Sequence, residues 1–374
     1  MKYGKIFAAV TVVFFCAFHP CFAAEEKSKA DEIMERRQKA ELKTFYLADP
    51  KASKVPETPI SIQLFNQAVE FFQHQEYDLA RDALNDALKY DKANGFAYEL
   101  LGDIDNMQEK LADAKKNYEI AYNLNPREST KEKIEKLNGE RKASKNLATY
   151  NEQHFIIKYN KKSDQDKGFE LRELLRTTYA RISKDFGYYF NHQVVVILYD
   201  PAEFKKIEGL PHWAAGMYDG KVRMPMNPGG FADLDVRALT THEVTHAFVA
   251  GMSGNRAPAW INEGLAQHEE NKIKPVEMIV FESAIKTSAL MPLIELMQPD
   301  ATQKLNDPLL VSLFYQESLH LVNYLVARYG MFLVKQMLAD YGKGKDSEEV
   351  VRERLRISSE RLEKEWKASF LKTS

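Results

Sequence analysis

The chain has 374 residues, of which 44% are hydrophobic and 28% are charged, with a formal net charge of -2 at pH 7. This is the composition of a globular protein, and the length is sufficient for more than one domain. A near-neutral charge supplies no positive field for a phosphate backbone, so a nucleic-acid partner is not expected.

Residues 1–24 have the features of a secretory signal peptide. Lys2 and Lys5 precede a thirteen-residue apolar run from Ile6 to Phe18, and small residues follow at the end of the segment. The run is too short to span a bilayer, so a cleaved signal is favoured, with no stable membrane span after cleavage. Both cysteines lie in this segment, so the mature protein would contain no disulfide. The sequence therefore predicts a secreted protein that acts in a bacterial periplasm or outside the cell.

Two 34-residue repeats, residues 61–94 and 95–128, follow a charge-dense segment at residues 25–60. Small residues recur at matching offsets: Ala68 with Gly102, Ala80 with Ala114, and Ala87 with Ala121. This is the period of tetratricopeptide repeats, which form an α-solenoid of paired helices. Four amphipathic helices with coincidental spacing are the alternative. Because two repeats bury little surface alone, residues 129–150 are expected to supply a capping helix and linker.

Such an array offers a groove to a protein partner. The same groove can equally pack against the remainder of the chain.

From residue 151 to residue 374 the pattern is that of an α+β domain. Strands are predicted at Phe155–Tyr159 and Val194–Tyr199, with a helix over Phe169–Phe186 between them. Asp219-Gly220 predicts a hairpin with a two-residue turn. Three helices are predicted to close the domain, at Leu309–Tyr329, Met331–Tyr341 and Ser347–Phe370. We therefore expect a small sheet packed beside a helical lobe, with the α-solenoid in front.

The most informative motif is an H-E-x-x-H pentapeptide at residues 242–246. On a helix, His242 and His246 lie on one face and can bind the same metal ion. Glu243 would project beside the metal, where a carboxylate can take a proton from water. A surface helix with two unrelated histidines is the alternative. The apolar residues around the pair favour a buried helix, in which each imidazole needs a partner.

A catalytic zinc needs a third protein ligand. The metzincin pattern fails, because Met252 stands where its third histidine should be. Glu263 lies seventeen positions after His246, which allows the first helix to end and a second helix to bring a carboxylate back. The sequence therefore predicts a metal site formed by His242, His246 and Glu263. These ligand types favour one Zn²⁺ per chain.

These residues resemble the gluzincin zinc peptidases. Thr241–His246 together with Pro258–Ala266 is similar to the bacterial peptidase-MA-like domains, relatives of the thermolysin and aminopeptidase groups. Gly216–Pro225 and Phe314–Gly330 resemble the hairpin before the metal helix and the helix after it in that family. The likeness covers about residues 153–374. It implies a thermolysin-like catalytic domain with a small mixed sheet and a helical lobe, and a hairpin at the sheet edge that an extended substrate can join.

The resemblance also implies roles for individual residues. Glu243 would be the general base in hydrolysis of a peptide or protein substrate. Tyr315 matches a tyrosine of the corresponding family helix and is the candidate hydrogen-bond donor to the oxyanion. An aromatic of the core is the alternative for Tyr315. Gln267 stands where the family more often has Glu, and it is the candidate acceptor for an imidazole N–H.

Two functions remain open. The first is a secreted zinc peptidase whose repeats recruit a substrate or a protein partner. The second is a tetratricopeptide binding or scaffold protein with a vestigial or structural metal site. Glu243 favours the first, since a structural site has no use for a base.

Overall fold

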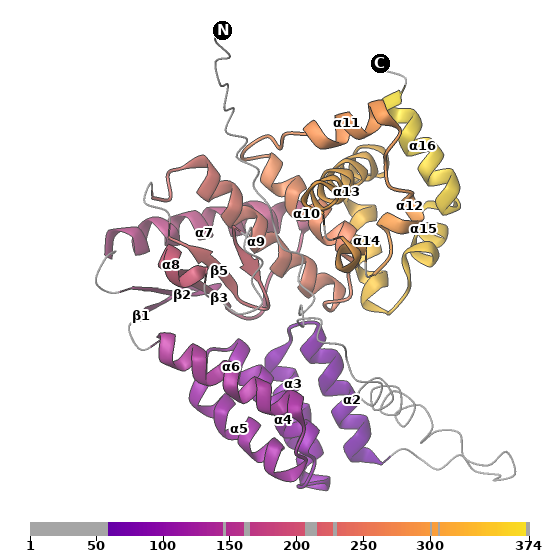
Figure 1. Cartoon of the computed structure of the whole chain (residues 1–374). Coiled ribbons are helices and arrows are strands. Elements are labelled where there is room, and N and C mark those ends of the chain that lie inside the picture. Colours follow the sequence, from indigo (N-terminus) through magenta and orange to yellow (C-terminus); the bar gives the residue numbers. More distant parts are fainter. Residues whose placement is uncertain are drawn as a thin grey trace, which may run out of the picture.

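The computed structural model describes residues 59–144, 147–160, 165–205, 215–226, 230–299, 301–305 and 307–371. The expected signal peptide and nearly all of the charged segment at 25–60 lie outside these residues. Figure 1 shows a layer of N-terminal helices below a sheet, with a larger helical lobe beside the sheet. Among the described residues, no helix combines the length and apolar character needed to cross a membrane.

The N-terminal layer consists of five helices that we call the helical unit. They are α2 (Ile60–Gln73), α3 (Tyr77–Tyr90), α4 (Gly95–Met107), α5 (Leu111–Leu124) and α6 (Glu128–Ser144). The small residues at the repeated offsets are buried at the helix contacts. A Cβ atom on Gly102 would lie 2.4 Å from Cδ1 of Tyr118, so only glycine allows α4 and α5 to approach this closely. The N-terminal region therefore has the form of a helical repeat.

Helix α6 covers the second helix pair of the unit. Leu137 of α6 is buried in a cluster with Ala114 and Tyr118. Thr130 of α6 donates a hydrogen bond to the buried carboxylate of Glu99 on α4. Polar groups of α4 are thus satisfied within the chain.

The sheet has five strands in the order β1-β2-β3-β5-β4. Strands β2, β3 and β5 are parallel, whereas β1 and β4 are antiparallel to their neighbours, so the sheet is mixed. The strands are β1 (Leu147–Asn151), β2 (Phe155–Asn160), β3 (Val194–Tyr199), β4 (Met217–Tyr218) and β5 (Val222–Pro225). Strand β1 was not predicted, and the sheet starts inside the segment expected as cap and linker. Strand β4 forms the edge next to β5.

The β4–β5 turn has three residues, and the predicted two-residue turn is wrong. Tyr218 pairs with Val222, which leaves Asp219, Gly220 and Lys221 in the loop. Gly220 has a φ of +93°, a conformation that glycine adopts without strain. Lys221 stays in the loop because its ammonium group is buried against the helical unit.

The two faces of the sheet have different coverings. Helices α7 (Gln165–Phe186) and α9 (Leu234–Ser253) share one apolar core with Ile157 and Val196. Because side chains alternate along a strand, Ile156 and Val195 point to the opposite face. That face also carries Lys158, which is ion-paired with Glu109 of the helical unit.

The helical lobe follows α9. It contains α10 (Ala259–Asn271), α11 (Ile279–Thr287), α12 (Leu293–Leu296), α13 (Pro308–Tyr329), α14 (Met331–Gly342), α15 (Ser347–Leu355) and α16 (Ser359–Leu371), together with a 3₁₀ turn at Ala301–Lys304; the short α8 (Pro201–Phe204) follows β3. The last predicted helix is two helices. Arg356 adopts a left-handed φ of 61° and ends α15, and the Ser358 hydroxyl accepts a hydrogen bond from the Arg361 amide as α16 begins.

The burial of Glu317 on α13 should make the stability of the protein depend measurably on pH. It is fully buried, and its carboxylate accepts a hydrogen bond from the Met291 amide. Burial raises the pKa of Glu317 to about 8, above the value of 4.5 expected for the unfolded chain. The neutral form is therefore favoured by folding. The stability from this group is fully present below about pH 4.5 and is lost as the pH rises to about 8.

The Glu317→Gln variant stays neutral at every pH and keeps an oxygen for the Met291 amide. Between pH 4 and pH 9, its free energy of unfolding should therefore rise relative to the wild type by about 5 kcal/mol. Urea unfolding at the two pH values measures this difference. A difference between variant and wild type that is the same at both pH values would contradict the argument.

Candidate metal centre

Helix α9 places the H-E-x-x-H residues in the interior of the domain. Its N-cap is Asp233, whose carboxylate accepts a hydrogen bond from the Asp235 amide, and it ends at Gly254 with a left-handed φ of 58°. His242, Glu243 and His246 are buried in the middle of this helix. The two histidines are one turn apart and so share one face.

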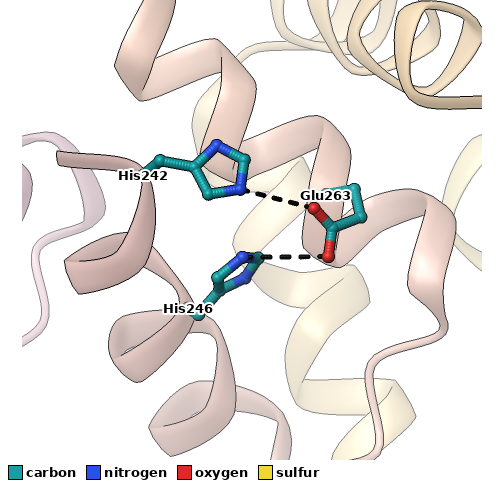
Figure 2. A group of neighbouring side chains, drawn as sticks. All are labelled: His242, His246 and Glu263. Carbon is teal, nitrogen blue, oxygen red and sulfur yellow. Dashed lines mark ion pairs between the residues drawn. The ribbon is translucent and has the colours of Figure 1, made fainter. Parts of the chain in front are cut away.

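His242, His246 and Glu263 meet at one point. The His242 Nε2 atom is 3.4 Å from Oε2 of Glu263, and the His246 Nε2 atom is 3.7 Å from Oε1. Figure 2 shows both imidazoles of α9 directed at the carboxylate that α10 carries. One ligand atom from each residue lies within 4.8 Å of the other two. The structure therefore brings together all three residues that the sequence predicts as metal ligands.

Close packing of α10 against α13 fixes the position of Glu263. A Cβ atom on Gly264 would lie 2.5 Å from Val322 Cγ2 and 2.6 Å from the Ser318 carbonyl oxygen. Only glycine permits this approach. Glu263 is therefore held by a contact between two helices that are far apart in the sequence.

The second nitrogen of each imidazole also has a partner. His242 Nδ1 is 2.9 Å from the Glu270 carboxylate, and His246 Nδ1 is 3.1 Å from Oδ1 of Asn262. These contacts favour a hydrogen on each Nδ1 and leave Nε2 as the nitrogen that faces Glu263.

The predicted role of Gln267 is wrong, since Glu270 and Asn262 take it. Sequence reasoning missed Glu270 and Asn262 as the partners of the two imidazoles. Glu270 carried a usable signal, because it lies seven positions after Glu263 on the same helix and therefore on the same face.

Burial and nearby charges shift the pKa values of the site. Burial lowers the pKa of His242, but the nearby carboxylates of Glu263 and Glu270 outweigh it and raise this pKa to about 10. Burial lowers the pKa of His246 to about 4 and raises that of Glu243 to about 8. Binding of a divalent cation must therefore displace a proton from His242, because a metal-binding imidazole is neutral.

The donor set fits a divalent cation. Within the part of the chain that the structure describes, both carboxylate oxygens of Glu263 and the Nε2 atom of His246 are buried without a hydrogen-bond partner. Buried polar atoms normally have one, and a bound cation satisfies several at once. Two imidazoles and one carboxylate are the three protein ligands of a catalytic zinc with an open fourth position.

A comparison with protein families agrees with this geometry. Residues 180–372 match the family described as the Peptidase MA superfamily, which is more than half of the chain. The chain belongs to this superfamily. No curated protein matches the chain.

All of the site residues lie inside the matched region, from α9 through α13. The Peptidase MA domain is therefore the part of the chain that contains the candidate metal centre. The helical unit and strands β1 and β2 precede the match.

Strand β4 and the residue before it lie directly on the site. A Cβ atom on Gly216 would be 2.6 Å from Oε1 of Glu243, so the backbone passes against this carboxylate with no room for a side chain. The Tyr218 ring lies nearly parallel to the His246 ring, with 6.4 Å between centroids. The edge of the sheet thus forms one wall around Glu243 and His246.

Glu243 lies beside the candidate metal ligands of the Peptidase MA domain rather than among them. It is fully buried, and both of its carboxylate oxygens lack a hydrogen-bond partner among the described residues. A buried carboxylate with a raised pKa, next to a metal site, is suited to proton transfer.

Tyr315 lies on α13, the helix that packs against α10. It is buried, and its ring is edge-on to Phe314. Tyr315, Ser318 and Val322 share one helical face, and the latter two pack against Gly264. Tyr315 is therefore on the side of α13 that faces α10, and its role as oxyanion donor stays a prediction.

Proposed function

We propose that this protein is a zinc-dependent peptidase with one Zn²⁺ held by His242, His246 and Glu263. The observation that carries the proposal is the buried group of two imidazoles and one carboxylate, with Glu243 beside it, inside a Peptidase MA domain. A purely structural site would have no use for a second buried carboxylate next to the ligands. The domain is proposed to share the thermolysin-like arrangement of the gluzincins.

In peptide hydrolysis, different residues of this chain would have different roles. When bound, Zn²⁺ supplies a Lewis acid that lowers the pKa of water and polarises a carbonyl group. Glu243 takes the proton of the attacking water and passes it to the leaving amine. Tyr315 donates a hydrogen bond to the oxygen that becomes negative in the transition state. Glu270 and Asn262 hold the imidazoles in the tautomer that presents Nε2.

The sheet edge suits an extended peptide substrate. Strand β4 is the outermost strand beyond β5, and it borders Glu243 through Gly216. A peptide that joins this edge is recognised by its backbone more than by its side chains. The substrate is therefore proposed to be a peptide or an unfolded segment of a protein.

The remaining proposals concern place and partners. The segment at 1–24 is proposed to direct the peptidase to a periplasm or to the outside of the cell. The helical unit is proposed to consist of two tetratricopeptide repeats with α6 as the cap, and to present substrate or a protein partner to the domain.

Hydrolysis of fluorescently labelled casein tests the function. The zinc-loaded protein is expected to release labelled peptides, to lose this activity after treatment with a chelator, and to regain it when zinc is restored. Casein is a suitable probe because its chain is largely unfolded. Zinc-loaded protein that binds casein without cleaving it would favour the scaffold alternative instead.

A further inference from the structure

The β4–β5 hairpin connects the metal centre to the helical unit. On one side, Gly216 lies against Glu243 and the Tyr218 ring lies beside His246. On the other side, a Cβ atom on Gly220 would be 2.5 Å from Sδ of Met107, at the end of α4. The same short hairpin thus contacts Glu243 and His246 on one side and the end of α4 on the other.

Two turn residues of the helical unit bind this hairpin from equivalent positions. Gln75 lies between α2 and α3, and Glu109 lies 34 positions later between α4 and α5. The Gln75 side-chain amide donates a hydrogen bond of 2.9 Å to the Tyr218 hydroxyl. The Lys221 ammonium donates to the Glu109 carboxylate over 3.1 Å.

Both residues have an unusual backbone conformation. The φ angles of Gln75 and Glu109 are 61° and 60°, in the left-handed region that favours glycine. A residue with a long side chain is therefore strained at each turn, although glycine would fit both. The contacts of these two side chains with the hairpin explain why glutamine and glutamate, rather than glycine, stand at the two turns.

Two buried cations on the hairpin require partners, and the helical unit supplies several of them. Lys221 and Arg223 are 1% and 3% exposed, and a buried cation is strongly unfavourable without a partner. Glu140 of α6 pairs with both of them, and Lys221 also donates to Asn106 of α4. Arg223 also contacts Asp219 of the turn and the Tyr199 hydroxyl of β3, whereas the partners of the Lys221 ammonium belong to the helical unit.

We propose that the helical unit is a built-in clamp on the active-site hairpin, with Gln75 and Glu109 as positioning residues for the peptidase reaction. Their contacts hold the strand that borders Glu243 and accepts the substrate backbone. The helical unit therefore acts on catalysis through the hairpin, and the turns that carry Gln75 and Glu109 are not a free surface for a partner. The effect on hydrolysis rests on the proposed function, whereas the clamp itself does not.

The test replaces each turn residue by glycine, as Gln75→Gly, Glu109→Gly and the double variant. Glycine suits the left-handed backbone, so these changes remove the side-chain contact while they relieve strain. Gln75→Gly also leaves the buried charges unchanged, so it is informative even if Glu109→Gly fails to fold. Arg356→Gly is the matched control, because Arg356 has the same φ of 61° but is an exposed residue at the end of α15.

Three readouts separate the clamp from a merely structural role. Hydrogen exchange of the amides between Gly216 and Met224 should become about tenfold faster in each clamp variant and not in Arg356→Gly. Zinc per chain should be unchanged. The kcat for casein hydrolysis should fall about tenfold, because β4, the strand that the substrate joins, is no longer held in place against Glu243.

Hairpin exchange within about twofold of the wild type in Gln75→Gly would overturn the clamp. Faster exchange with unchanged kcat would overturn the positioning role. If the wild-type protein loaded with zinc leaves casein intact, the proposed function fails, and the exchange measurement alone decides whether the clamp exists.

Discussion

The Glu243→Gln variant is expected to lose casein hydrolysis by about three orders of magnitude while it keeps its zinc. Glutamine has nearly the same shape as glutamate, so the fully buried site is not left with a cavity. It cannot accept a proton from water, which removes the general base. The three residues that meet at the metal position do not include Glu243, so metal binding should be unaffected.

Initial rates of casein hydrolysis and zinc per chain measure the two parts of this expectation. Glu282→Gln is the matched control, because it makes the same chemical change at an exposed residue of α11. Wild-type rates in Glu243→Gln would remove Glu243 from the mechanism. Loss of zinc in this variant would show that Glu243 is a ligand.

The second large effect concerns the third ligand. Glu263→Ala is expected to weaken zinc binding by more than the 10- to 100-fold that is typical when a group beside the ligands is removed. The change deletes the one carboxylate between His242 and His246, and two imidazoles alone leave the metal without its third protein ligand. Hydrolysis should be lost with the metal.

Glu270→Gln provides the graded comparison for this prediction. Glu270 contacts Nδ1 of His242 rather than the metal position, so its replacement should fall within the 10- to 100-fold range. Competition with a coloured zinc chelator measures both affinities. Equal losses in Glu263→Ala and Glu270→Gln would contradict the assignment of Glu263 as a ligand.

The candidate ligands could be predicted because their signals are short and chemical. The spacing of His242 and His246 places both on one helical face, and a carboxylate seventeen residues later is in reach of a returning helix. Neither inference needs long-range packing. The groups behind the imidazoles are different, since Gln267 and Glu270 are both plausible on α10, and only the rotation of α10 against α9 selects Glu270.

The parts that could not be predicted depend on contacts between distant segments. The hairpin turn has three residues because Lys221 is buried against the helical unit, and nothing near Asp219-Gly220 in the sequence indicates this. In the sequence, Gln75 and Glu109 are indistinguishable from ordinary turn residues, because their partners on the hairpin are distant along the chain. The repeat period correctly predicted a helical region, but a period carries no information about which of its turns meet the sheet.

The metal content of the purified protein tests the central claim most directly. Elemental mass spectrometry after zinc loading and removal of excess metal should find about one zinc per chain in the wild type and almost none in His246→Ala. Circular dichroism of both proteins verifies that the variant is folded. A folded wild-type protein without zinc, or equal zinc in the two proteins, would contradict a zinc peptidase built on His242, His246 and Glu263.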